Sequence, residues 1–270
     1  MKQIIKVICV VGMSLLVGCS GKPSYIDQTQ RVKNVVCAKN IMNFDRNLAA
    51  EKRLQIATHK ISHGQVEMGK KNLDCALKYA PEKPIVHRVY GYYFEFVGET
   101  EQAEAAYKYA LKLSPNDPDS LNQYGVFLCK NQQYDKAIKH FLKAISIPSY
   151  TQVSSSFENA GICSVESGNV TQAESFFRKA LSYDRDSKKS LLEMADIYFK
   201  KANLQVAHSY ISRYMKVAKH SPRSLWLAMR IEKERGDNNA LGSYAVKLEQ
   251  MFPDSEETAQ YQEIKQKWQR

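Results

Sequence analysis

Blocks of apolar and small residues recur along the chain with a period of 34 residues. The block Tyr107–Leu111 is followed one period later by Phe141–Ile145, which has the same order of bulky and small side chains. The next block, Phe177–Leu181, comes after 36 residues and places a two-residue insertion near residues 148–150. A fixed period of this length indicates a repeat architecture in which each unit is one helix pair.

Columns of similar residues hold their places through successive repeats, and each column has a physical cause. Small residues allow the two helices of one repeat, A and B, to approach closely, and a bulky residue on helix B fills the space toward the next repeat. Glycines lie in the turn between A and B, where a positive φ is often needed. The helix A column is Gly91, Gly125, Gly161, Ala195 and Ala228; the helix B column is Ala103, Ala137, Ala173, Ala207 and Ala240; the bulky column is Leu73, Tyr107, Phe141, Phe177, Ile211 and Tyr244; and the turn glycines are Gly64, Gly98, Gly168 and Gly236.

These columns resemble the tetratricopeptide repeat and predict an all-α, superhelical tetratricopeptide-repeat solenoid of about six helix pairs. The first and last pairs match the pattern least, as capping repeats do. In the polar tail, Tyr261, Ile264 and Trp268 share one face of an expected capping helix. The predicted segments are a signal peptide at 1–18, a lipidated N-terminus and tether at 19–49, repeats at 50–83, 84–117, 118–153 (with an extended loop), 154–187, 188–220 and 221–254, and a capping helix at 255–270.

The first nineteen residues have the pattern of an export signal. Two lysines, Lys2 and Lys6, precede an apolar run that is too short to span a membrane as a stable helix, and Gly18 and Cys19 follow it. This arrangement resembles the lipobox of bacterial lipoproteins, which implies lipidation of the Cys19 thiol and cleavage before that residue. By resemblance to enterobacterial sorting, Ser20 favours the outer membrane of a Gram-negative host. An ordinary secretory signal with an incidental cysteine, or an uncleaved anchor, remains an alternative.

Four cysteines remain after cleavage and lipidation: Cys37, Cys75, Cys129 and Cys163. An oxidising compartment such as the periplasm permits disulfides. Cys37 and Cys75 would pair if the N-terminal segment folds back on the first repeat, whereas Cys129 and Cys163 lie on helix faces of different repeats. Spacing alone does not fix the connectivity, which stays open.

The formal net charge of +11 is spread along the chain. Basic residues distributed in this way are typical of solvated helix faces, and no docking motif accompanies them, so no nucleic-acid partner is expected. Attraction to an anionic membrane surface or an acidic partner accounts for the excess more simply.

Motifs of catalysis are not found in the sequence, and we expect no cofactor, no metal and no enzymatic activity. His59 and His63 stand four residues apart, but Glu does not follow His59 as the zinc-protease motif requires. Neither a phosphate-binding loop nor a nucleophile elbow occurs. The run 154–156 of three serines is interpreted as the capped start of a helix. A metal enzyme using His59 and His63 is the least favoured alternative.

Helix A of each repeat lines the concave wall of such a superhelix. Its positions two, five, nine and twelve face the groove, and their mixture of apolar, amide and charged groups suits an extended or helical peptide. The candidates are Ile85, Arg88, Tyr92 and Glu95 in the second repeat, Asp119, Asn122, Val126 and Cys129 in the third, and Ser155, Glu158, Ile162 and Val165 in the fourth. Alternatively, Val126 and Ile162 pack against the neighbouring helix A.

Three helix A segments are more specific than the general repeat: Leu121–Cys129, Phe157–Cys163 and Ser190–Tyr198. Their order after a lipobox resembles the type IV pilus biogenesis lipoproteins of the PilF/PilW family, from about His59 to Phe252. The resemblance implies an outer-membrane pilotin that helps the secretin subunit to reach that membrane and to multimerise, which supports pilus biogenesis and twitching motility. The implied partners are the secretin subunit and, through the lipid on Cys19, the outer membrane. The alternative is a periplasmic adaptor that regulates a cell-wall enzyme or another envelope complex.

Overall fold

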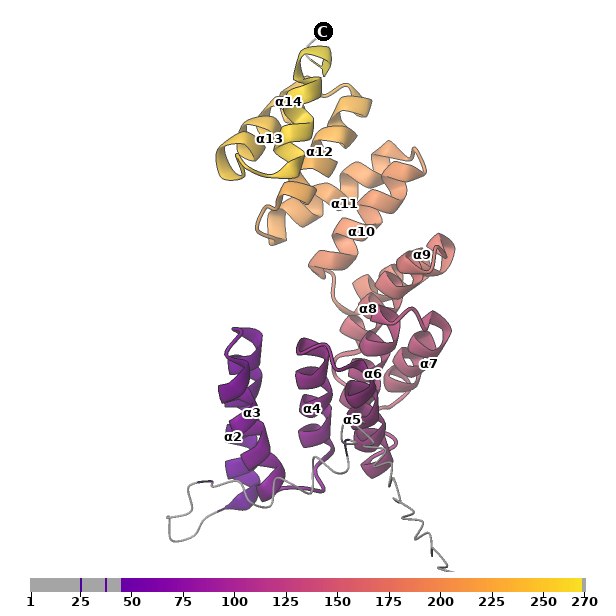
Figure 1. The fold of residues 1–270 in the computed structure, drawn as a ribbon. Coiled ribbons are helices and arrows are strands. Elements are labelled where there is room, and N and C mark those ends of the chain that lie inside the picture. The colour runs from indigo at the N-terminus through magenta and orange to yellow at the C-terminus, as the bar shows by residue number, and fades with distance from the viewer. Residues whose placement is uncertain (1–24, 26–36, 38–44, 269–270) are drawn as a thin grey trace, which may run out of the picture.

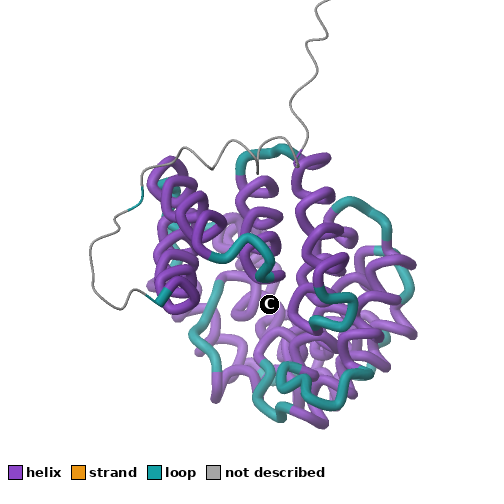
Figure 2. Tube along the Cα trace, turned by 90° about the horizontal axis from the view of Figure 1, so that it is seen from below, coloured by secondary structure: helices purple, strands orange, loops and turns teal. Residues whose placement is uncertain are grey.

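The computed structural model describes Tyr25, Cys37 and residues 45–268. The predicted signal peptide, the lipidation site Cys19 and most of the predicted tether lie outside the described residues. Within the described part every regular element is a helix, as Figure 2 shows, which confirms the all-α class. No helix in that part is both long enough and apolar enough to cross a bilayer.

In residues 45–268, twelve helices form six antiparallel pairs that follow one another from α2 and α3 at one end to α12 and α13 at the other (Figure 1). The A helices are α2 (Arg46–Ser62), α4 (Pro84–Phe96), α6 (Pro118–Lys130), α8 (Val153–Glu166), α10 (Lys188–Lys200) and α12 (Pro222–Arg235). The B helices are α3 (Val66–Tyr79), α5 (Thr100–Leu113), α7 (Tyr134–Ile145), α9 (Val170–Tyr183), α11 (Leu204–Val217) and α13 (Asn238–Met251). A last helix, α14 (Glu256–Trp268), packs on α12 and α13.

The turns between paired helices require a positive φ, and the predicted glycines supply it in four of the six repeats. Gly64, Gly98, Gly168 and Gly236 have φ between 73° and 80°. In the third and fifth repeats Gln132 and Ala202 take this place, with φ of 59° and 54°. Non-glycine residues adopt this region at some cost, so the tight turn is retained there against local preference.

The glycine column of helix A exists because a ring of helix B lies directly on it. A Cβ at Gly91, Gly125 or Gly161 would come within 2.6 to 2.7 Å of the ring at position 107, 141 or 177 of the same repeat. Tyr107 also contacts the next helix A, with its ring centroid 5.9 Å from that of Tyr124. The bulky column therefore closes two gaps at once, within its own repeat and toward the next.

The predicted tail helix caps the C-terminal end of the core. Tyr261 is 5% exposed, and the indole of Trp268 stacks on Trp226 of α12 with ring centroids 5.4 Å apart. Together with Leu225, Met229 and Leu248 these rings form the last of a series of core clusters. The polar outer face of α14 thus ends the stack, as a solenoid cap must.

The beginning of the first helix differs from the sequence-based boundary at residue 50. Helix α2 begins at Arg46, inside the segment expected to be tether, because Asp45 accepts hydrogen bonds from the backbone N–H groups of Asn47 and Leu48. Such an N-cap satisfies donors that the first turn leaves free.

The capping interpretation of the serine run was wrong. The N-cap of α8 is Gln152, whose side chain makes no capping hydrogen bond. Ser156 is instead buried and donates to Asn122 Oδ1 at 2.8 Å, while Ser154 donates to the carbonyl oxygen of Ala180 at 3.0 Å. The serines join α8 to its neighbours, which the sequence pattern could not distinguish from capping.

Candidate functional site

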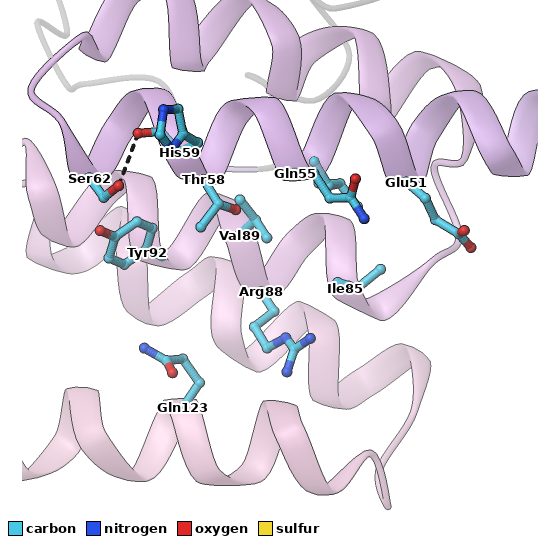
Figure 3. A pocket seen from close by; sticks show the side chains of 11 residues that line it. Glu51, Gln55, Thr58, His59, Ser62, Ile85, Arg88, Val89, Tyr92 and Gln123 are labelled. Carbon is cyan, nitrogen blue, oxygen red and sulfur yellow. Dashed lines mark hydrogen bonds between the residues drawn. The ribbon is translucent and has the colours of Figure 1, made fainter.

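A pocket on the concave wall is lined by residues of α2, α4 and α6 (Figure 3). Its volume is about 870 Å³, within the range of roughly 300–1,000 Å³ that is typical of ligand sites. The lining residues are Glu51, Leu54, Gln55, Thr58, His59 and Ser62 from α2, Ile85, Arg88, Val89 and Tyr92 from α4, and Gln123 from α6. Three successive A helices thus contribute to one site.

The predicted groove residues of the second repeat reach this pocket. Ile85 is 36% exposed and lines the pocket together with Arg88 and Tyr92. Figure 3 shows the Arg88 side chain on the side of α6, where Gln123 also lies. Arg88 Nη1 lies 3.3 Å from Asp119 Oδ2 of the next repeat. The ion pair holds the guanidinium at the pocket wall and leaves part of its donor set for a ligand.

Glu95, the fourth candidate of that repeat, serves a structural purpose. Its carboxylate accepts a hydrogen bond from the Tyr107 hydroxyl and lies 3.0 Å from Lys130 Nζ. Burial first, and then the neighbouring Glu95, raise the pKa of Tyr107, so this hydroxyl stays protonated and donates. The pair connects α4 with α5 and, through Lys130, with α6.

The candidates of the third repeat are bonded along the wall. Asn122 Oδ1 accepts from Ser156 Oγ at 2.8 Å and from Asn159 Nδ2 at 3.1 Å. Cys129 is 7% exposed and disulfide-bonded to Cys163, with Cα atoms 5.7 Å apart. Val126 packs, half-buried, against the core. These side chains connect α6 with α8.

In the fourth repeat Glu158 accepts hydrogen bonds from Ser187, at 2.5 Å, and from Ser190, at 3.3 Å. Ile162 and Val165 are partly buried and pack against a core cluster that runs from α9 to α12. Ser155 lines a smaller polar pocket of about 280 Å³ between α8 and the start of α10. Val126 and Ile162 are thus both partly buried against the core.

The α2 side of the pocket was missed because the first repeat matches the pattern poorly. A step of 34 residues back from Ile85 and Tyr92 gives Glu51 and Thr58, which both line the pocket. The register that selected the second-repeat residues therefore contained this signal. Gln55 and His59 each lie one residue after a position that corresponds to a candidate of the second repeat, so helix positions two, five, nine and twelve did not include them.

His59 and His63 lie near the C-terminal end of α2 with ring centroids 4.1 Å apart. His63 Nδ1 is 2.8 Å from the carbonyl oxygen of His59, so one ring nitrogen is engaged with the backbone. Among the described residues, no group of three or more His, Cys, Asp or Glu side chains gathers in a way that could hold a metal ion.

Comparison with known proteins agrees with this geometry. The tetratricopeptide-repeat family profile matches residues 106–139, which run from helix B of one pair into helix A of the next. This is a tetratricopeptide-repeat solenoid. Its repeats are the six helix pairs α2–α13, and the predicted fold is confirmed.

Among tetratricopeptide-repeat proteins, the chain is similar to the type IV pilus assembly protein PilF of Pseudomonas aeruginosa. The two are 29% identical over 217 residues, which cover 80% of this chain and 86% of that protein. The solved structure of Pseudomonas aeruginosa PilF superposes with a TM-score of 0.72 at 28% identity, covering 80% of this chain and 98% of that one. The resemblance suggested by the helix A segments is confirmed.

The crystal structure of PilW, a widely conserved type IV pilus biogenesis factor, gives a TM-score of 0.69 at 24% identity. The match covers 78% of this chain and 97% of PilW. At this identity the likeness concerns the fold, and it shows that the arrangement of repeats is shared over most of the solenoid.

Proposed function

We propose that this protein is an outer-membrane pilotin that binds the type IV pilus secretin through the pocket between α2, α4 and α6. The lipid on Cys19 holds the protein at the periplasmic face of the outer membrane. Binding brings the secretin subunit to that membrane and promotes its multimerisation, which supports pilus biogenesis and twitching motility. The observation that carries the proposal is the three-helix pocket in a chain similar to PilF over 80% of its length.

The chemistry of the pocket suits a peptide segment of the partner. Leu54, Ile85 and Val89 offer an apolar floor for one or two side chains. Gln55 and Gln123 carry amide groups that both donate and accept, as the backbone of an extended peptide requires. Arg88 adds a cation for a carboxylate or a carbonyl oxygen. The protein thus acts as an adaptor and carries out no reaction of its own.

A lipid anchor makes moderate affinity sufficient for this task. Several acyl chains hold a protein on a membrane far more firmly than one chain does. Confinement of adaptor and partner to one surface raises their effective concentration, so binding at the pocket need not be tight. Cys19→Ala should release the protein into the periplasm and leave its affinity for the secretin subunit unchanged.

The role is tested in a strain that lacks the gene. We expect detergent-resistant secretin multimers in the outer membrane to fall sharply, while the level of unassembled subunit in the envelope persists. Normal multimers at normal abundance would exclude a pilotin role. Intact pili together with co-purification of a cell-wall synthase or hydrolase would instead support the periplasmic regulator.

The pocket is tested with matched variants in the complemented strain. Ile85→Gln and Tyr92→Ala should each weaken secretin binding by about tenfold or more, as anchor residues in an interface do. The control is Leu142→Gln, an aliphatic side chain that is 42% exposed on α7, outside the pocket. Equal secretin binding by all three variants would show that the contact lies outside this pocket. The loss of secretin multimers in the deletion strain would still support the pilotin role.

A further inference from the structure

Tyr25 is buried although it lies 21 residues ahead of the first helix of the solenoid. Its side chain is 4% exposed and occupies a slot between α4 and α5. The rings of His87, Tyr90, Phe94 and Tyr109 surround it, with centroids 5.8 to 6.2 Å from its own. All four contacts are edge-on, which is a favourable arrangement of aromatic rings.

A hydrogen bond fixes the hydroxyl of Tyr25 at the end of this slot. His87 Nε2 lies 2.6 Å from the carbonyl oxygen of Pro81, so this nitrogen carries the proton and donates. His87 Nδ1 is then the acceptor, and the Tyr25 hydroxyl, 2.5 Å away, donates to it. Burial lowers the pKa of His87, which favours the neutral ring that this chain of bonds needs.

A covalent bond fixes the segment a second time, twelve residues later. Cys37 is disulfide-bonded to Cys75 of α3, with Cα atoms 5.7 Å apart, and both cysteines are buried. The pairing of Cys37 with Cys75, which the sequence left open, is thereby present at the first repeat. The chain ahead of α2 is thus held on the second repeat through Tyr25 and on the first through Cys37.

The slot and the concave pocket lie on two sides of one helix. α4 presents Ile85, Arg88 and Tyr92 to the pocket, whereas His87, Tyr90 and Phe94 face Tyr25. Because α4 contacts Tyr25 on one side and forms the pocket wall on the other, the contact with Tyr25 also fixes the position of that wall relative to the N-terminal anchor.

We infer that the slot between α4 and α5 is a docking site for the protein's own N-terminal segment, which sets the distance and orientation of the pocket relative to the membrane. The inference rests on the lipidation of Cys19 proposed above. Cys19 and Tyr25 are six positions apart, and the chain between them spans at most about 20 Å. Without docking, the chain would be fixed first by the Cys37–Cys75 disulfide, and the stretch of 18 positions from Cys19 to Cys37 would reach roughly 60 Å when extended. Docking therefore shortens the tether several-fold.

The docking itself is tested by hydrogen exchange on the purified mature lipoprotein in detergent. In the native protein we expect slow exchange in the peptide that contains Tyr25 and in α4. Tyr25→Ala should raise exchange at residues 22–30 at least tenfold, and Tyr25→Phe, which keeps the ring, should raise it less. Tyr183→Ala removes a tyrosine that is 65% exposed and is the control. Fast exchange around Tyr25 in the native protein would overturn the inference.

The positional consequence is tested with ten-residue Gly-Ser insertions at two places. One insertion, between Gly21 and Lys22, lies on the anchor side of Tyr25; the other, between Arg31 and Val32, lies between the two fixed points. A fluorophore on an azido residue in place of the exposed Glu101 reports energy transfer to labelled lipid in vesicles of phosphatidylethanolamine and phosphatidylglycerol. Only the anchor-side insertion should reduce transfer in the native background, whereas both should reduce it equally with Tyr25→Ala.

Equal effects of the two insertions in the native background would show that Tyr25 does not set the distance, and would overturn the inference. Tighter secretin binding by Tyr25→Ala would overturn it as well, since the slot would then belong to the partner. Failure of the protein to bind vesicles, with an unmodified Cys19 by mass spectrometry, would reject the anchor of the proposed function and the membrane distance with it. Hydrogen exchange would then still decide the docking separately.

Discussion

The concave wall differs between the first two repeats and the central ones, although the same helix positions face it throughout. Between α2 and α4, Ile85 and Tyr92 border an open pocket. Between α6, α8 and α10, the corresponding wall is bridged by Asn122 to Ser156, by Cys129 to Cys163 and by Glu158 to Ser187. Where side chains of successive A helices are bonded to one another the wall is closed, whereas between α2 and α4 it stays open.

The largest effect is expected from removing the covalent bridge of the central wall. Replacing both Cys129 and Cys163 with serine releases a loop of 34 residues, which corresponds to about 3–4 kcal/mol of stabilisation in the chain-entropy description. Urea unfolding followed by circular dichroism measures the loss. Replacing Cys37 and Cys75 releases a loop of 38 residues and should cost a similar amount, while the bridge of the central wall stays in place. An unchanged midpoint would show that the polar contacts alone close the wall.

A second effect concerns the close contact of helices A and B in the central repeats. Gly161→Ala places a Cβ about 2.6 Å from the Phe177 ring and should cost about 1–3 kcal/mol. Gly242→Ala in α13 meets nothing within 4 Å and should be neutral or stabilise by about 0.4–1 kcal/mol. Thermal melts of both proteins provide the comparison. Similar shifts in melting temperature would mean that the ring moves aside at little cost.

A third prediction compares one variant in the central wall with one variant in the pocket. Asn122→Ala removes the oxygen that accepts from Ser156 and Asn159, and Ser156 keeps only its hydrogen bond with the Tyr150 hydroxyl. The free energy of unfolding should fall by about 1 kcal/mol, with secretin binding unchanged. Tyr92→Ala should do the reverse. Unfolding midpoints and binding constants are measured on both variants. If Asn122→Ala weakened secretin binding as much as Tyr92→Ala did, the distinction between a stabilising central wall and a binding pocket would be wrong.

The smallest effect is expected for an ion-pair cluster that joins α9 to the following repeat. Hydrogen bonds from Lys201, Tyr198 and Arg178 lower the pKa of Glu174 to about 2. Because the folded pKa lies below the unfolded one, this contribution is present above about pH 4.5 and is lost as the pH falls toward 2. Solvent screening limits it to about 1 kcal/mol or less.

Glu174→Gln should therefore lower the melting temperature slightly at pH 6, and the difference from the native protein should narrow at pH 3. Glu101→Gln, at an exposed position of α5, is the control for loss of one negative charge. A difference that stays constant between the two pH values would show that the cluster does not depend on the charge of Glu174.

Much of the fold followed from periodicity, because the columns are set by contacts inside each repeat. The small residue of helix A and the bulky residue of helix B, such as Gly125 and Phe141, are 16 residues apart in every copy of the motif. The sequence alone therefore predicted the close approach of the two helices. What lies between successive A helices depends on which side chains meet across repeats. Periodicity placed Asn122 and Glu158 on the wall, but it carried no information about Ser156 or Ser187 as their partners.

The candidate site was predicted in part for the same reason. Ile85, Arg88 and Tyr92 line the pocket, whereas the α2 side was passed over since its repeat departs from the pattern. The docking of Tyr25 had no periodic signal at all. A single aromatic residue in a polar stretch is recognisable as an anchor only when the slot that receives it is seen.

The disulfide between α6 and α8 also has a mechanical consequence. Because each repeat of a solenoid contacts only its neighbours, a pulling load acts on the interfaces between successive repeats. A covalent bond across the concave wall prevents the third and fourth repeats from separating there. Under load from a large assembly, strain would be confined to the segments on either side, and the open pocket at α2 and α4 lies in one of these compliant segments.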